Sequence, residues 1–284
     1  MISHSGRPRP WIFHGLPVVP GVALHLISVL TREDWTTREI VELSNADPSL
    51  VVDILNSANT GRAEERFCDS VDRAAVAVGS RRLHAICLAS TIRQMMGYKG
   101  QTDLMGDCWR HSRAVALASQ TLAPAFEIDS SRCYTAGLLH NVGLLALLAE
   151  YAPEYEDLLA VSSPDSGSIL DAEKARFDID HCEAGAWLCT HWSLPAAFQD
   201  VASAHHVHEP TTPSLLSLVV IAARAAEACG HQLGIPYSCP VADPTEAIAL
   251  AVSIATGRDE ARVHRYAAEC VTSVSSDLTF APIP

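Results

Sequence analysis

The sequence predicts an all-α fold, in which an N-terminal helical lobe packs on a second helical bundle. Apolar residues recur at three- and four-residue spacing along most of the chain, and this is the period of one face of a helix. Residues that begin helices precede these segments, and glycines end several of them. Alternating Val, Ile and Thr runs joined by Asn-Gly turns, which would indicate strands, do not occur.

The first lobe contains five predicted helices, each with its own start signal. In chain order, the signals are apolar spacing from Val18 to Leu30, the capping-box pair Thr36 and Glu39, the cap and first-turn proline of Asp47-Pro48, the cap Ser70, and Ser80. Gly79 ends the fourth helix, and the fifth runs to about Met96. These signals divide the chain into a tail over 1–15 and a helical lobe over 16–105.

The second lobe is predicted to begin near Asp107 and to form a bundle over 106–230, which C-terminal helices over 231–284 complete. Its predicted helices are, in order, 109–122, 129–151, a short one from Pro153, one capped by Asp180 with Glu183, one from Pro195 to His206, 215–229, one from Asp243-Pro244 to Gly257, and 259–274. The run from 129 to 151 is apolar enough to be a buried core helix.

The chain is acidic, with a formal net charge of -13 and a pI of about 5.4. Binding to a phosphate backbone needs clustered Lys and Arg, so we expect no nucleic-acid partner. A helix-turn-helix over 36–59 is disfavoured for the same reason, because its second helix carries Asp47 and Asp53 and no basic residue. Five arginines near the following loop form a modest basic cluster: Arg62, Arg66, Arg73, Arg81 and Arg82.

The nine cysteines are scattered, and no CxxC pair occurs. This use of cysteine favours a reducing cytoplasm over a disulfide framework. The segment before residue 15 lacks the apolar core of a signal peptide. The most apolar stretches, 136–149 and 215–228, contain polar residues and are too short for a clean membrane span. We therefore expect a cytoplasmic protein without a membrane segment.

Five histidines of the second lobe fall where helices begin, end or face a core: His111, His140, His181, His205 and His206. They are far apart in sequence, but side chains on facing helices of a bundle can converge on one site. A single histidine in such a place is more often a core residue with satisfied hydrogen bonds. Five in one lobe favour a pocket.

These histidines resemble the ligand pattern of the HD phosphohydrolase superfamily, with His140 inside AGLLHNVG. The first lobe, through LPVVPGVALHLISVL, NADPSLVVDILNSAN and SVDRAAVAVGSRRL, is similar to the HDOD family, the HD-related output domain. The resemblance covers about Leu16 to His206 and extends more weakly to Cys229. It implies an HD-like bundle and a non-catalytic output role in bacterial signal transduction, as in response regulators. It also makes Asn59, in LNSAN, part of a hallmark segment, although no chemical role follows.

The chain departs from the enzyme pattern at two positions. Asn141 stands where the superfamily has the Asp of its His-Asp pair, and the later Asp would fall near Ala223, where no carboxylate exists. Hard cations prefer charged oxygen ligands, and a carboxylate usually bridges a metal pair. A two-metal hydrolase mechanism is therefore disfavoured, and we assign no catalytic residue.

The resulting expectation is a non-catalytic regulatory domain with a vestigial HD pocket of His111, His140, Asn141, His181, His205 and His206. It would act through an unidentified regulatory protein partner, with a small-molecule ligand as a further option. No cofactor is expected. A single Zn, Ni or Fe ion held by His111, His140, His181 and His205 stays open, as does the alternative of a metal-dependent phosphohydrolase acting on a nucleotide or cyclic dinucleotide.

A zinc cluster of His181, Cys182, Cys189 and His191 is disfavoured. On one helix, about two turns separate the first histidine from the second cysteine, which is too far for a single tetrahedral site.

Overall fold

A computed structural model describes residues 21–32, 34–45, 48–60, 68–95, 103–161, 169–192, 194–206, 209–233 and 243–276. Every regular element within these ranges is an α-helix, which confirms the all-α prediction. The predicted tail over 1–15 and the cap Asp47 lie outside the described residues.

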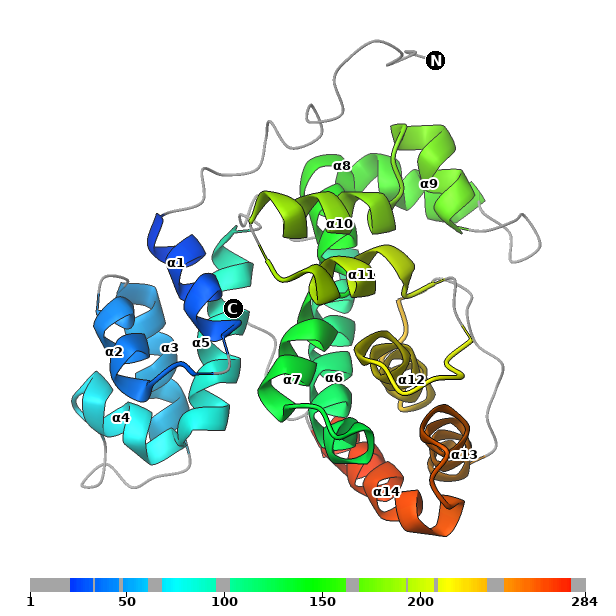
Figure 1. Ribbon diagram of the computed structural model, residues 1–284. Helices are drawn as coiled ribbons and strands as arrows, with labels where there is room; N and C mark the ends of the chain where they lie inside the picture. The colour runs from blue at the N-terminus through cyan, green and yellow to red at the C-terminus, as the bar shows by residue number, and fades with distance from the viewer. Residues whose placement is uncertain are drawn as a thin grey trace. The chain divides into compact units, whose positions relative to one another are not determined.

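The chain divides into two compact units, one over Leu16–Tyr98 and one over Lys99–Pro284. The N-terminal unit contains α1 (Gly21–Leu30), α2 (Thr37–Ser44), α3 (Pro48–Asn59), α4 (Val71–Val78) and α5 (Ser80–Met95). The C-terminal unit contains α6 (Asp103–Phe126), α7 (Ser130–Leu139), α8 (Val142–Val161), α9 (Ile169–Phe177), α10 (His181–His191), α11 (Ala196–Ala204), α12 (Leu215–Ala228), α13 (Pro244–Thr256) and α14 (Glu260–Ser276). Figure 1 labels these helices.

Local chemistry fixes the helix ends of the N-terminal unit. The Thr36 and Glu39 pair forms a complete capping box ahead of α2, and the Ser70 side chain accepts a hydrogen bond from the N–H of Arg73. Gly79 ends α4 at φ 77°, a backbone conformation that costs glycine little. These three predicted signals are confirmed.

The side chain of Asn59 closes the loop that follows α3. Its amide Nδ2 donates to the Cys68 carbonyl at 3.0 Å, and its Oδ1 accepts from the Cys68 N–H at 2.6 Å. Both partners are backbone groups nine positions along the chain. Asn59 therefore acts as a structural clamp, which gives the LNSAN segment a physical role that the sequence alone did not.

The long helix α6 packs against α7, α12 and α14 and forms the centre of the C-terminal unit (Figure 1). It begins at Asp103 and ends at Phe126, with Pro124 inside its last turn, whereas the predicted helix covered only 109–122. The predicted helix was short at both ends. The added residues include Gly106, which lowers helix stability by only roughly 0.5–1 kcal/mol relative to alanine, and Pro124, whose missing N–H falls in the last turn.

The predicted single helix over 129–151 is wrong. The structure has α7 and α8 separated by a turn at His140 and Asn141, and α8 is kinked at Tyr151, two residues before Pro153. All residues from Cys133 to Leu148 are buried, so the segment is apolar on every face. Its periodicity therefore gave no sign of the break, which places the His-Asn pair at a helix junction.

Two glycines allow α8 and α10 to touch. A Cβ atom on Gly143 would lie 1.9 Å from the His181 carbonyl oxygen and 2.4 Å from the Gly185 nitrogen. Only a residue without a side chain fits this crossing. The close approach brings the start of α10, and with it His181, next to the helix junction that carries His140.

The caps predicted for α10 and α13 are present, and the structure has one further helix, α9, that was not predicted. Asp243 caps α13 through the N–H groups of Thr245 and Glu246, and Gly257 ends it at φ 67°. Asp180 caps α10 by accepting from the Glu183 N–H, whereas the Glu183 carboxylate pairs with Lys174. The helix α9 was not predicted.

The segment Ser130–Ala160 is long and apolar enough to cross a membrane by length and composition, but 89% of its most apolar window is buried inside the protein. Such extensive burial is typical of a core segment of a folded protein.

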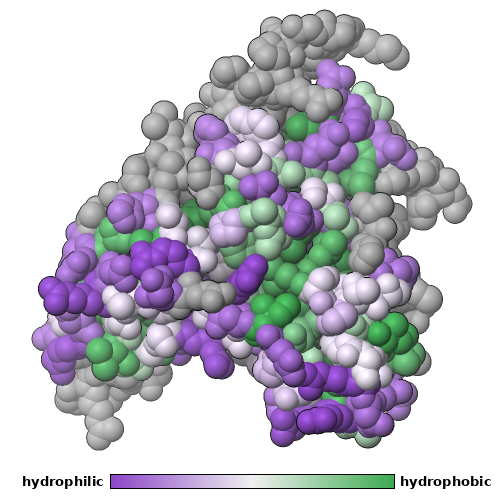
Figure 2. Space-filling model, in the orientation of Figure 1, coloured by the Kyte–Doolittle hydropathy of each residue, from purple (hydrophilic) through white to green (hydrophobic). Residues whose placement is uncertain are grey.

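All eight cysteines within the described ranges are free thiols. On the face in view in Figure 2, hydrophilic and apolar side chains are interspersed, and the large exposed apolar residues in the described part are Val52, Val76, Leu250 and Ile254.

Candidate functional site: a histidine pocket in the C-terminal unit

The five predicted histidines come together in one cluster of tilted and edge-to-face rings. The ring centroids of His111 and His140 are 5.3 Å apart, and those of His140 and His205 are 5.1 Å apart. His205 lies 5.4 Å from His181 and 4.3 Å from His206. The helices α6, α7, α10 and α11 each place at least one of these imidazoles at the same point.

Four of the five imidazoles are held by a hydrogen bond at Nδ1. His111 Nδ1 lies 2.8 Å from the His231 carbonyl oxygen, and His140 Nδ1 lies 2.6 Å from that of Gly137. His205 Nδ1 faces the carbonyls of Val201 and Ala202 at 3.2 and 3.1 Å. Carbonyl oxygens only accept hydrogen bonds, so each Nδ1 carries the hydrogen and each Nε2 keeps a lone pair. This is the tautomer of a metal-ligating histidine.

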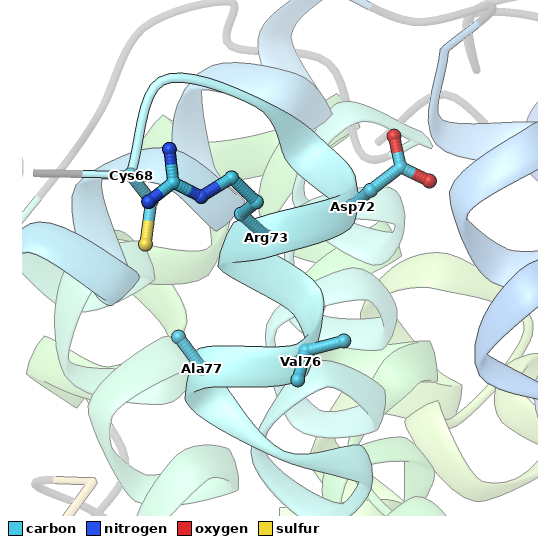
Figure 3. Close-up of a pocket in the computed structure, with 5 residues that line it drawn as sticks. All are labelled: Cys68, Asp72, Arg73, Val76 and Ala77. Carbon is cyan, nitrogen blue, oxygen red and sulfur yellow. The ribbon is translucent and has the colours of Figure 1, made fainter.

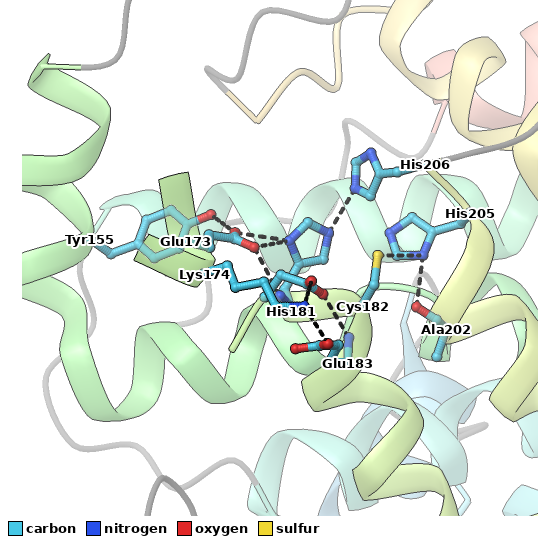
Figure 4. Close-up of polar contacts among 10 residues, drawn as sticks. Tyr155, Glu173, Lys174, His181, Cys182, Glu183, Ala202, His205 and His206 are labelled. Atoms are coloured by element: carbon cyan, nitrogen blue, oxygen red, sulfur yellow. Dashed lines mark hydrogen bonds and ion pairs between the residues drawn. The ribbon is translucent and has the colours of Figure 1, made fainter. Parts of the chain in front are cut away.

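The fourth anchored imidazole, His181, is held by a buried carboxylate (Figure 4). Glu173 in α9 faces His181 Nδ1 at 2.7 Å and accepts from the His181 backbone N–H at 2.8 Å. The Tyr155 hydroxyl also donates to Glu173. Burial alone would lower the pKa of His181, but the Glu173 carboxylate raises it to about 10. The His181 ring is therefore an imidazolium at neutral pH, paired with Glu173.

The other imidazoles of the cluster are neutral. Burial lowers the pKa of His111 to about 4 and that of His205 to about 3, and it holds the pKa of His140 well below the ordinary value. Burial and the neighbouring His205 lower the pKa of His206 as well. The pocket thus presents a set of neutral nitrogen donors around one ion pair.

Two carboxylates of the superfamily's metal site are missing from the pocket. Asn141 is 2% exposed, and its Oδ1 has no hydrogen-bond partner among the described residues. The helix α12 carries Ala223 at the expected position, and its single carboxylate, Glu227, lies one turn beyond with Arg224 as its neighbouring charge. These residues do not fit a pair of hard metal ions, which needs charged oxygen ligands.

A different donor set lies at one end of the cluster. Within the described residues, His181, Cys182, His205 and His206 each offer one ligand atom, and these four atoms lie within 4.8 Å of one another. The set contains Cys182 and His206 in place of His111 and His140. Cys189 is turned to the Phe198 carbonyl and His191 stacks on Trp187, so the second half of the disfavoured zinc cluster lies elsewhere.

No sequence signal identified Glu173 or Tyr155 as parts of the pocket, and Cys182 was considered only within the disfavoured zinc cluster. Glu173 lies on the helix that was not predicted, and its burial is a tertiary effect without a sequence motif. Cys182 directly follows His181, and adjacent residues on a helix point about 100° apart. The one available signal was that both residues lie in the first turn of α10, where the neighbouring α11 can reach them.

A separate hollow of about 470 Å³ lies on α4 in the N-terminal unit (Figure 3). Its lining residues are Cys68, Asp72, Arg73, Val76 and Ala77. Val76 is 77% exposed, and Arg73 pairs with Asp69 at 3.0 Å. Of the predicted basic cluster, Arg62 and Arg66 lie outside the described residues. The hollow therefore presents the Asp72 carboxylate and an Arg73 guanidinium already paired with Asp69. This is not the cluster of available positive charges that an anion site needs.

The fold and the pocket define a protein of the HD-like, all-helical class, and comparison with known proteins names the family. The family model of the HDOD domain matches residues 16–208. The chain therefore belongs to the HDOD family, which is part of the HD phosphohydrolase-like superfamily. The expected resemblance is confirmed.

Solved structures share this fold. An HDOD domain protein of unknown function from Geobacter sulfurreducens superposes with a TM-score of 0.68 at 22% identity, over 93% of this chain and 94% of that one. A candidate phosphohydrolase from Shewanella amazonensis superposes with a TM-score of 0.69 at 22% identity, over 93% of this chain and 95% of that one. A candidate signal transduction protein from Marinobacter aquaeolei superposes with a TM-score of 0.65 at 20% identity, over 93% of this chain and 58% of that one.

One curated relative matches in sequence. An uncharacterized protein of Treponema pallidum is 25% identical over 197 residues, which cover 67% of this chain. The match spans 37% of that relative's length.

Proposed function

We propose that this chain is a non-catalytic signal-transduction module of the HDOD type, which acts through a regulatory protein partner and binds a ligand in its histidine pocket. The observation that supports the proposal is the replacement of two metal-ligand carboxylates, at Asn141 and at Ala223, in a pocket whose imidazoles remain anchored. Loss of the charged ligands removes the means to hold two metals and to orient a nucleophilic water. The retained anchoring supports a binding role.

The alternative is a metal-dependent phosphohydrolase that acts on a nucleotide or cyclic dinucleotide. The observation that favours it is the group of four potential ligand atoms within 4.8 Å, together with the phosphohydrolase name of the Shewanella amazonensis neighbour. A single ion with an open coordination position can activate water. This alternative therefore makes a positive prediction about turnover.

Phosphodiesterase and phosphomonoesterase assays separate the two functions. Purified protein would be supplied with Mn²⁺, Fe²⁺ or Ni²⁺ and incubated with nucleotides and cyclic dinucleotides. We expect no turnover above the rate of the His140→Ala variant. Turnover that His140→Ala abolishes, and that the control His191→Ala retains, would overturn the proposal. His191 is a suitable control because it is exposed and stacks on Trp187 outside the cluster.

A further inference from the structure

We propose that His181, Cys182, His205 and His206 form a closed site for a single zinc-like transition-metal ion, with Cys182 as a thiolate ligand. This proposal rests on the proposed function and names the ligand of the same pocket. It differs from the superfamily's metal site in using sulfur and in lacking every carboxylate ligand.

The spacing of the donors suits a tetrahedral ion. A zinc ion lies about 2.1 Å from nitrogen and about 2.3 Å from sulfur, so its ligand atoms are roughly 3.3–3.8 Å apart. In the protein, His181 Nε2 lies 2.7 Å from His206 Nε2, and Cys182 lies beside the His205 ring, with Sγ 3.9 Å from its Nδ1 (Figure 4). Each of the four residues offers one ligand atom within 4.8 Å of the others. For His205 the atom that would bind the ion is Nε2, since Nδ1 faces two backbone carbonyls. Shifts of about 1 Å bring such a set to tetrahedral spacing.

An unsatisfied nitrogen points to a ligand independently of this spacing. His205 Nε2 is shielded from solvent and has no hydrogen-bond partner among the described residues. Its Nδ1 is committed to the carbonyls at the end of α11, so the Nε2 lone pair is available. Buried polar atoms are rarely left unpaired in proteins, and a missing ion is one explanation for such an atom.

The surroundings of His181 match those of a metal ligand. Carboxylates behind ligating histidines fix the ring and raise its basicity, and Glu173 holds this position against His181 Nδ1 at 2.7 Å. Both side chains are at most 1% exposed. On binding, the ion would replace the hydrogen between the two Nε2 atoms of His181 and His206 and the thiol hydrogen of Cys182, and both protons would pass to solvent.

The donor set selects the metal and the role of the site. Three imidazoles with one thiolate suit zinc and its neighbours, whereas Mg²⁺, Ca²⁺ and Mn²⁺ prefer oxygen ligands. Four protein ligands complete a tetrahedron and leave no position for a reactive water. A closed site of this kind is structural or regulatory, and it ties α10 to the end of α11.

Cobalt spectroscopy tests the sulfur ligand directly. The reduced, metal-free full chain would be titrated anaerobically with Co²⁺. We expect one equivalent to bind, with the intense visible bands of tetrahedral cobalt and a near-ultraviolet thiolate-to-cobalt charge-transfer band, and Zn²⁺ should displace it. Cys182→Ser should lose the charge-transfer band. The matched control Cys189→Ser, which changes another buried cysteine of the same helix, should keep it.

Three outcomes would overturn the proposal: no cobalt bound, tetrahedral bands without charge transfer, or a charge-transfer band that survives Cys182→Ser. If Cys182→Ser does not fold, X-ray absorption of the zinc-loaded wild-type protein decides, since it should show one sulfur at about 2.3 Å and three nitrogens at about 2.0–2.1 Å. A shell of nitrogen and oxygen alone would contradict the site. These readouts report metal binding and not turnover. The metal site can therefore be refuted while the proposed non-catalytic function stands, and the reverse also holds.

Discussion

The Glu173 carboxylate holds His181 at two points. Its Oε2 atom accepts from the His181 backbone N–H at 2.8 Å and lies 2.7 Å from the His181 Nδ1. One acidic residue of α9 thereby fixes both the first residue of α10 and the orientation of its ring. Removing a charge from water is expensive, and a buried pair is stable only when its hydrogen bonds are complete. The Tyr155 hydroxyl supplies a further one. The pair is thus a structural support of the pocket.

Substitution of Glu173 by alanine should strongly destabilise the protein. The change removes the carboxylate that pairs with the buried His181 ring and accepts from the Tyr155 hydroxyl, and loss of one partner from a buried ion pair costs about 3–5 kcal/mol. Urea unfolding followed by circular dichroism measures this loss. The control is Glu183→Ala, whose partner Lys174 is 51% exposed, and it should cost less than about 1 kcal/mol. Equal losses in the two variants would show that Glu173 does not act as described.

Gly143→Ala should prevent the normal packing of α8 on α10. The added Cβ would lie 1.9 Å from the His181 carbonyl oxygen, and no side-chain rotation can relieve a contact with backbone. We expect a loss of more than about 3 kcal/mol, beyond the usual cost of overpacking, measured by urea unfolding.

The control for this substitution is Gly106→Ala. A Cβ at that position would meet only the Arg110 guanidinium at 3.3 Å, at the flexible end of a side chain. Within a helix, alanine is favoured over glycine by roughly 0.5–1 kcal/mol, so this variant should be neutral or slightly more stable. A neutral Gly143→Ala would contradict the close crossing of the two helices.

Local signals in the sequence predicted most helix ends, because capping is decided by residues within one turn. Thr36 and Glu39, Asp243, and Gly257 all act as expected. The resemblance to the HD superfamily pattern also pointed to the five histidines, which lie far apart in sequence and which the structure brings together. The helix caps are readable because their chemistry depends on residue type and on short spacing.

Features that depend on packing between distant segments were not predictable. The turn at His140 lies inside a segment that is buried on all sides, so its apolar pattern continues through the break. Glu173 has no motif that marks it as buried, and only the packed structure places its carboxylate against His181. The potential role of Cys182 likewise depends on α11 bringing His205 to within 3.9 Å.

Asn59→Ala should destabilise the N-terminal unit by about 1–3 kcal/mol, since it removes two hydrogen bonds to Cys68 and each contributes roughly 0.5–1.5 kcal/mol. Asn59→Asp keeps the acceptor but loses the Nδ2 donor, so it should not restore stability. Asn56→Ala, at an exposed position of the same helix, is the control and should stay within about 0.5 kcal/mol of the wild type. Thermal and urea unfolding measure all three variants. If Asn59→Ala is as stable as this control, Asn59 does not act as a structural clamp.

Four buried thiols should resist alkylation in the folded protein. Burial raises the pKa values of Cys87, Cys133, Cys189 and Cys270 to about 12, so at pH 8 roughly one in ten thousand of each is the reactive thiolate. Raising the pH from 7 to 9 should leave them largely unmodified. Cys229 is only partly buried and should be labelled before them.

Iodoacetamide labelling with peptide mass spectrometry measures these rates thiol by thiol. The control is the same reaction in denaturant, where the burial that separates Cys229 from the other four is lost and all five should react at similar rates. Rapid labelling of Cys270 in the native protein would contradict its burial between α14 and the helices packed on it. Because α14 packs against α13, α6 and α12, such a result would mean that α14 opens locally from the helices it packs on.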